Sequence, residues 1–206
     1  MGRQKEKQAG RALRAALAGQ MLRAAEKGWL RLPTGPAVQI LQNTAAAAFG
    51  RKGRRVWYLP RQRALEEFAA FTAACLRGMP DPAADRRLYR QALGLGRRIR
   101  RVSGLSRRED LQRLVFFLYR MIGIDMAGHL PGEITVASCF FSRFYGPEQC
   151  ARMSRMDAGV LAGICGNGNL VFTERITEGC GRCRACYGFT HCGSAGESGT
   201  FTRGEK

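Results

Sequence analysis

The 206-residue sequence has little lysine, few acidic residues, two histidines and no long hydrophobic run. A membrane-spanning helix needs about 20 consecutive apolar residues, and no such run free of charge occurs here. The segment from Met1 to Gly19 has no uninterrupted apolar stretch and no clear cleavage site, so it does not match a secretory signal. We therefore expect a chain without a membrane span, located in the cytoplasm, where cysteines stay reduced.

Arginine supplies most of the charge. The chain has 34 Lys+Arg, of which five are lysine, against 16 Asp+Glu, giving a net charge of +18. Residues 1–120 hold 26 of the basic residues and 8 of the acidic ones, whereas residues 121–206 hold 8 of each. A clustered basic surface binds phosphate polymers by releasing counterions. The arginine-, alanine- and glycine-rich composition that a GC-rich genome produces gives the same excess on any solvated surface.

Other signs of nucleic-acid recognition are lacking in this basic part. No aromatic residues alternate with the arginine clusters at 51–55 and 97–101, and neither helix-turn-helix nor zinc-finger spacing is present there. Binding of nucleic acid is therefore not favoured. The partner that we expect is a small-molecule substrate.

Helical periodicity dominates the first 128 residues. Apolar residues recur at three- and four-residue spacing, and the sequence Ser106-Arg107-Arg108-Glu109 matches a capping box at the start of one helix. Helices are predicted at 4–27, 37–49, from Pro60 onward, at 85–101 and from Ser106 onward. We interpret residues 1–128 as a basic helical region that covers the rest of the chain.

The pattern changes after Gly128. Strands are predicted at 133–141, 169–177 and 185–190, with a helix at 147–161 and a turn at 163–168 between them. Residues 129–192 thus form a cysteine-rich α+β core, and the Gly/Ser-rich residues 193–206 form a flexible tail. The predicted fold class is α+β, with a helical N-terminal layer packed on a small C-terminal β-α-β-β sheet unit.

Cysteine is concentrated in this second part. Without secretion a disulfide framework is disfavoured, so metal binding or thiol chemistry is the leading explanation. The spacing Cys180-x-x-Cys183-x-x-Cys186 suits a shared metal ion or iron–sulfur cluster. The eight cysteines are Cys75, Cys139, Cys150, Cys165, Cys180, Cys183, Cys186 and Cys192.

Two ligand sets remain open, for zinc or for an iron–sulfur cluster. If residues 183–186 form a strand, positions three apart face opposite sides of the sheet, and Cys183 and Cys186 diverge. A local set would use Cys180, Cys183, Cys186 and Cys192, whereas a composite set would use Cys139, Cys150, Cys180 and Cys183. We expect Cys75 and Cys165 to be buried thiols that pack as small hydrophobic residues.

Three further residues are candidates for chemistry. Asp157 follows Cys150 by seven residues on the same predicted helix, hence on the same face, and would act as a general base. His129 is expected at the surface of a loop. His191, beside Cys192, is either a metal ligand or a surface residue.

The stretch from Val136 to Tyr187 resembles the bacterial L-2-amino-thiazoline-4-carboxylic acid hydrolase-like family. The family pattern has a Cys at a strand end, a second Cys before a helix that carries an Asp, and a strand that ends in Thr. A Gly and a Cys-containing final strand complete it. The matching residues are Cys139, Cys150, Asp157, Thr177, Gly179 and Cys183. A fainter similarity, through residues 162–165, is to the iron-containing β-carotene isomerases of plants.

The resemblance implies a hydrolase that opens a cyclic C=N bond in a sulfur-containing amino-acid derivative. Cys183 or a metal-bound water would attack the ring carbon, and Asp157 would shuttle the proton. Arg175 or Arg184 would hold the substrate carboxylate. The alternative is a cysteine-ligated metal or iron–sulfur protein with a redox-sensing role or a role in binding nucleic acid or a partner. A structural zinc without activity is the third interpretation.

Overall fold

Helices cover one face of a small antiparallel sheet in the computed structural model, which describes residues 15–24, 34–77, 81–166 and 168–188. Residues 15–24 are helical. The other helices are α2 (Thr34–Phe49), α3 (Arg61–Leu76), α4 (Pro82–Ser103), α5 (Arg108–Met121) and α6 (Pro147–Cys165), with short 3-10 helices η1 (Phe140–Arg143) and η2 (Ile176–Glu178). The strands are β1 (Ile124–Gly128), β2 (Gly132–Cys139), β3 (Asn169–Glu174) and β4 (Cys183–Gly188). The predicted α+β class is confirmed.

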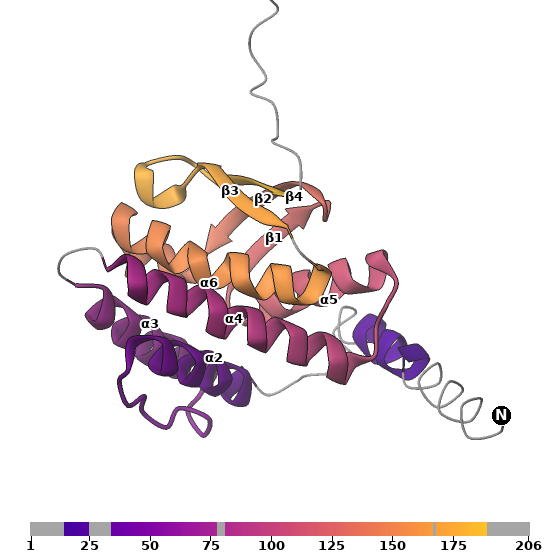
Figure 1. Cartoon of the computed structure of the whole chain (residues 1–206), viewed down its shortest axis with the longest axis horizontal. Coiled ribbons are helices and arrows are strands. Elements are labelled where there is room, and N and C mark those ends of the chain that lie inside the picture. Colours follow the sequence, from indigo (N-terminus) through magenta and orange to yellow (C-terminus); the bar gives the residue numbers. More distant parts are fainter. Residues whose placement is uncertain (1–14, 25–33, 78–80, 167, 189–206) are drawn as a thin grey trace, which may run out of the picture.

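The elements stack in layers (Figure 1). Helix α6 lies beneath the sheet, α4 packs against α6, and α2 and α3 form the layer farthest from the strands. A continuous cluster of buried apolar side chains runs from α2 through the helices to β4. The helical part and the strands therefore share one hydrophobic core.

The sheet has the strand order β1-β2-β4-β3, with every neighbouring pair antiparallel. Along β4, Cys183, Ala185 and Tyr187 are buried toward the helices, and the residues between them point to the other face. On that outer face Arg184 pairs with Glu174 at 3.3 Å and lies 3.9 Å from Glu133, so one guanidinium links three strands.

Several sequence predictions need correction at their edges. Strand β1 was not predicted, and it pairs with β2 across the boundary that the sequence suggested at Gly128. The sheet thus begins inside the region interpreted as purely helical. The capping box at Ser106 is also wrong, because α5 starts at Arg108 and the Leu111 amide bonds to the carbonyl of Arg107. The predicted tail at 193–206 lies outside the described residues.

Glycines allow α4 and α6 to pack with their backbones in contact. A Cβ atom at Gly96 would overlap the carbonyl oxygen of Val160, and one at Gly163 would lie 2.5 Å from that of Leu93. Gly159 faces α4 in the same way. The predicted helix-to-strand turn is present between α6 and β3, with Gly166 at positive φ, but it does not start at Gly163, which lies inside α6 and contacts α4.

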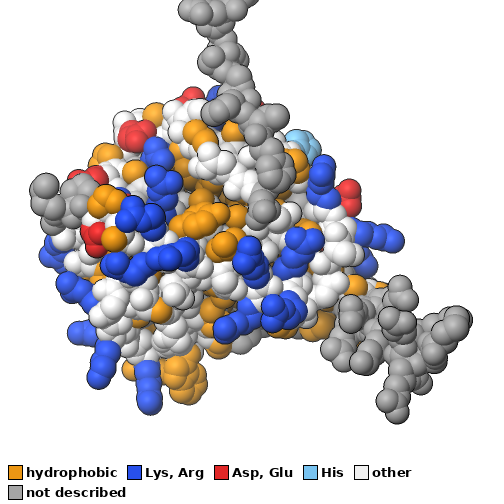
Figure 2. Space-filling view, in the orientation of Figure 1, with side chains coloured by type: hydrophobic (Ala, Val, Ile, Leu, Met, Phe, Trp, Pro, Cys, Tyr) orange, Lys and Arg blue, Asp and Glu red, His pale blue; other side chains and the backbone are white. Residues whose placement is uncertain are grey.

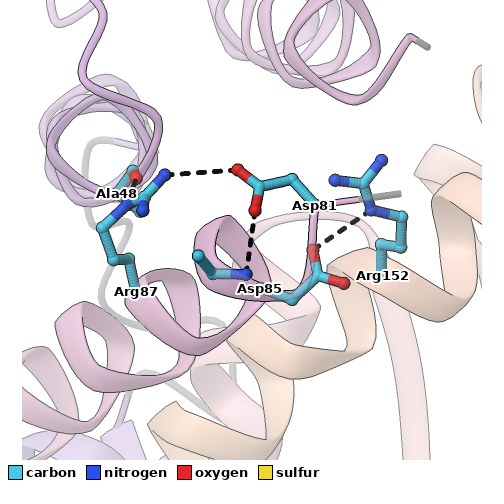
Figure 3. A network of polar contacts seen from close by, with 6 residues as sticks. Ala48, Asp81, Asp85, Arg87 and Arg152 are labelled. Atoms are coloured by element: carbon cyan, nitrogen blue, oxygen red, sulfur yellow. Dashed lines mark hydrogen bonds and ion pairs between the residues drawn. The ribbon is translucent and has the colours of Figure 1, made fainter. Parts of the chain in front are cut away.

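A polar network fixes the start of α4 (Figure 3). The Asp81 side chain caps the helix, and Arg87 pairs with it at 3.5 Å. Arg152 of α6, which is buried, donates from Nε to Asp85 at 3.1 Å and from Nη1 to the Leu76 carbonyl at 3.2 Å. One guanidinium thus joins the end of α3, the start of α4 and the middle of α6.

Among the described helices and strands, α4 carries the most basic side chains. Figure 2 shows Lys and Arg side chains gathered on the face that α4 and α6 present, with few acidic side chains among them. The α4 arginines are Arg86, Arg87, Arg90, Arg97, Arg98, Arg100 and Arg101. Within the described residues, no helix is both long and apolar enough to cross a membrane.

The helix contact predicts opposite effects for two alanine substitutions on α4. Gly96→Ala should lower the free energy of unfolding by about 1–3 kcal/mol, because the added methyl group forces the backbones apart. Gly94 is exposed with no atom within 4 Å of an added Cβ, so Gly94→Ala should raise stability by about 0.5–1 kcal/mol. Urea denaturation measures both. Equal stabilisation by the two substitutions would contradict the backbone contact.

Candidate active site

A cavity of about 240 Å³ lies between the helical layers and the sheet. Helices α2, α4, α5 and α6 supply most of its wall, and β1, β2 and the η1 segment close the end near the sheet. The wall is almost entirely apolar. Its polar side chains and thiols are few: Tyr119, Cys139, Tyr145, Cys150 and Asp157.

Helix α6 carries two of these groups on one face. Pro147 occupies the first turn, and the Gln149 side chain accepts a hydrogen bond from the Gly146 amide at 3.1 Å, which fixes where the helix begins. Cys150 and Asp157 follow seven residues apart and both line the cavity, as the helical spacing predicted. Their Cα atoms are separated by about 10 Å along the axis, enough to place a small substrate between them.

Asp157 is the ionisable group at the centre of the site. Burial raises the pKa of its carboxyl from 3.8 to about 6, and a hydrogen bond from the Tyr119 hydroxyl opposes part of that rise. Tyr119 Oη donates to Asp157 Oδ1 at 2.9 Å. The Asp157 side chain is half-buried, and it lines the cavity. A group with a pKa near neutrality can both accept and donate a proton.

Tyr119 was not identified from the sequence. Burial and the neighbouring Asp157 carboxylate raise the pKa of its phenol well above the usual value, so it remains a hydrogen-bond donor. The available signal was its position on the buried face of α5, four residues after Val115, since a buried tyrosine hydroxyl requires a partner. Tyr145, whose hydroxyl shares a hydrogen bond with Thr72, was missed in the same way.

Three free thiols from three elements surround this carboxyl. Cys139 ends β2, Cys150 lies in the first turns of α6, and Cys183 begins β4. Burial raises the pKa of Cys139 to about 12, so this thiol stays protonated. The Asp157 charge acts on all three and opposes their ionisation.

Cys150 and Cys183 are better placed than Cys139 to ionise. Burial raises the pKa of Cys150, and the Thr177 hydroxyl and the Arg175 charge counteract it. Thr177 Oγ1 is buried without a hydrogen-bond partner among the described residues, so its contact with this thiol is longer than a hydrogen bond. Burial likewise raises the pKa of Cys183, while the Ile176 amide, which donates to its Sγ at 3.3 Å, and Arg175 lower it. Cys150 lines the cavity, whereas Cys183 lies behind it on β4.

The two candidate arginines are separated by the sheet. The Arg175 guanidinium lies 4.8 Å from the Phe172 ring centre, pairs with Glu178 at 3.4 Å, and lowers the pKa of Cys150 and Cys183. Among the described residues its buried Nε has no hydrogen-bond partner, and Arg175 does not line the cavity. Arg184 is held by carboxylates on the outer face and does not join the group.

The other predicted site residues divide by position. Cys180 is a free thiol that interacts with Cys183, and Cys186 points to the face of β4 opposite Cys183, as the strand spacing predicted. Cys186 is also disulfide-bonded, so the expectation of reduced cysteines is wrong at this position and the local ligand set is not formed. His129 is exposed, and His191 and Cys192 lie outside the described residues.

The remaining free thiols lie away from this group. Cys75 on α3 and Cys165 at the end of α6 are each partly buried beside an arginine, and neither lines the cavity.

The residues as placed do not make a metal site. Within 15–24, 34–77, 81–166 and 168–188, no three His, Cys, Asp or Glu side chains have an arrangement that could hold a metal ion. The interactions nevertheless connect the composite set in series, from Cys139 to Cys150, Cys183 and Cys180. The comparison with family models, with curated proteins and with solved structures found no match to this chain.

The buried carboxyl predicts a pH-dependent stability difference. The folded chain binds a proton at Asp157 that the unfolded chain releases between pH 3.8 and about 6, so this contribution is present at low pH and lost as pH rises through 6. Asp157→Asn keeps the acceptor for Tyr119. Its stability relative to wild type should therefore increase by up to about 3 kcal/mol between pH 4 and pH 8.

Urea denaturation at the two pH values measures this difference. Asp125→Asn, at an exposed carboxyl on β1, is the matched control. A difference between wild type and Asp157→Asn that stays constant with pH would contradict the raised pKa.

Proposed function

We propose that this chain is a cysteine-dependent hydrolase that opens a cyclic C=N bond, with chemistry similar to that of the L-2-amino-thiazoline-4-carboxylic acid hydrolases. The observation that carries the proposal is Asp157, whose pKa is raised to about 6, in one cavity wall with free thiols. A buried carboxyl of this kind can move a proton between a thiol and a substrate nitrogen. The thiols of Cys139, Cys150 and Cys183 are free, as a cysteine nucleophile requires.

The thiol that we assign as nucleophile is Cys150. It lines the cavity, and the Thr177 hydroxyl and the Arg175 charge both favour its thiolate. Cys183, the nucleophile that the family resemblance implies, shares Arg175 but lies behind the wall. Its Sγ already accepts the Ile176 amide. When ionised, Cys183 also raises the pKa of Cys150, so the two thiols do not act together as thiolates.

The proposed reaction uses Asp157, Cys150, the substrate and one water molecule as reactant. Before the substrate enters, the Cys150 thiol proton passes through water to the Asp157 carboxylate, because the two side chains are too far apart along α6 for direct transfer. The Cys150 thiolate then bonds to the carbon of C=N, and the ring nitrogen receives a proton from Asp157. Water replaces the Cys150 sulfur at this carbon and gives its proton to Asp157, so that the thiolate and the protonated carboxyl are both restored. The hydrated carbon expels the ring heteroatom, which takes the hydroxyl proton, and a carbonyl forms. Arg175 does not line the cavity, so we assign its charge to the support of the Cys150 thiolate and not to a substrate carboxylate.

Substitution of single thiols tests the assignment. Cys150→Ser should lower kcat/KM for ring opening of 2-amino-thiazoline-4-carboxylate by more than about 100-fold, because a serine hydroxyl is not ionised at neutral pH. Cys183→Ser should cost less, and Cys75→Ser, at a thiol outside the cavity, should leave kcat/KM unchanged. Chromatography of the opened product follows the reaction.

The pH profile gives a second measure of the same mechanism. In wild type, kcat/KM should rise as pH increases through about 6, where Asp157 becomes the base, and Asp157→Asn should lack this limb. Full loss in Cys183→Ser with activity retained in Cys150→Ser would return the nucleophile to Cys183. Equal activity in all three thiol variants would exclude cysteine catalysis.

A cysteine-ligated zinc or iron–sulfur protein is the second candidate. The series of interactions that links Cys139, Cys150, Cys183 and Cys180 favours it. It predicts one metal ion or cluster per chain in protein purified without oxygen, and a lower content in Cys180→Ser. Metal analysis with an absorption spectrum measures this. Metal-free protein that opens the thiazoline ring would exclude it.

A further inference from the structure

The cavity continues well beyond the groups that the proposed reaction uses. Away from Asp157 and the thiols, its wall is aliphatic and comes from three helices: Ile40 and Leu41 of α2, Leu95 and Ile99 of α4, and Leu118 and Ile122 of α5. Ile40 is 50% exposed, so this end of the cavity reaches the surface. We call the part of the wall formed by these six residues the aliphatic end.

The volume is more than a single ring needs. An apolar cavity of about 150 Å³ is sufficient to hold benzene. The space here is about 240 Å³, which admits a ring with a short substituent or a branched alkyl chain. Its wall is too apolar to favour ordered water, which requires two to four polar partners.

The polar groups of the cavity are mostly engaged with protein. The Tyr119 hydroxyl bonds to Asp157, and the Tyr145 hydroxyl to Thr72. Among the described residues Tyr119 is the one hydrogen-bond partner of the Asp157 carboxyl, bonded through Oδ1, so Oδ2 is available to a ligand N–H. A zwitterion in the aliphatic end would leave its charges without partners, which is unfavourable.

We propose that the substrate is amphipathic: an apolar body, a substituted ring or branched alkyl chain, fills the aliphatic end and presents its C=N group to Asp157 and Cys150. The aliphatic wall selects the body by excluding water from it. The identity of the reacting group rests on the proposed function, whereas occupation of the aliphatic end does not.

Binding of neutral probes to the full chain tests the apolar part. Indole and isobutylbenzene should bind in calorimetric titration and raise Tm, and free cysteine, a zwitterion, should do neither. Ile99→Trp should weaken the binding of both probes at least 10-fold, because the larger side chain fills the space. Val102→Trp is the matched control, since Val102 lies on the same helix and is 80% exposed.

A gentler variant covers the case in which Ile99→Trp does not fold. Leu95→Phe adds less volume to the same wall. It should weaken the binding of isobutylbenzene more than that of indole, because indole is the shorter of the two probes. Failure of both probes to bind wild type, or equal binding by Ile99→Trp and Val102→Trp, would overturn the apolar-body assignment.

Turnover separates this inference from the proposed function. In a thiazoline series, replacing the 2-amino group by 2-isobutyl or 2-phenyl should raise kcat/KM by at least 10-fold. Probe binding without hydrolysis of any thiazoline would retain the apolar pocket and reject the hydrolase. Hydrolysis of the amino compound without probe binding would retain the hydrolase and reject the amphipathic substrate.

Discussion

The backbone contact between α4 and α6 is the constraint on which the site depends. Helix α6 carries Cys150 and Asp157, and α4 supplies the aliphatic wall at Leu95 and Ile99. Because Gly96 and Gly163 let the two helices touch without intervening side chains, they act as a rigid pair with a fixed rotation. The cavity opens where this contact ends and larger side chains separate the layers. The packing of α4 against α6 thus determines the position of the cavity wall.

Within the cavity, the Asp157 carboxyl affects the ionisation of the thiols around it. Removal from water makes Asp157 harder to ionise, and its charge, when present, discourages ionisation of the thiols around it. Arg175 acts in the opposite direction, because its positive charge lowers the pKa of Cys150 and of Cys183. The three cysteines therefore differ in reactivity through their surroundings: burial raises the pKa of Cys139 to about 12, whereas Cys150 lines the cavity and the Arg175 charge lowers its pKa.

The sequence was informative wherever periodicity carried the signal. The α+β class, the α6 face shared by Cys150 and Asp157, and the divergence of Cys183 from Cys186 all follow from spacing. The parts it did not predict depend on contacts between distant segments. Strand β1 is short and is stabilised by pairing with β2, which the sequence does not show. The glycines near the end of α6 resemble a turn in the sequence, and their role in contacting α4 is seen only in the structure. Tyr119 joins the site only because the α5 face meets α6.

Arg152 has a consequence for the covalent chain itself. Its guanidinium holds the last turn of α3 through the Leu76 carbonyl and the first turn of α4 through Asp85, so a third helix sets the register of these two. Continuity of the polypeptide between Arg77 and Asp81 is then not what aligns them. Two separate polypeptides divided at this point, one bringing α2 and α3 and the other bringing α4 onward, would retain the contacts that direct reassociation. The architecture is therefore suited to fragment complementation, in which association of the two polypeptides forms the cavity again.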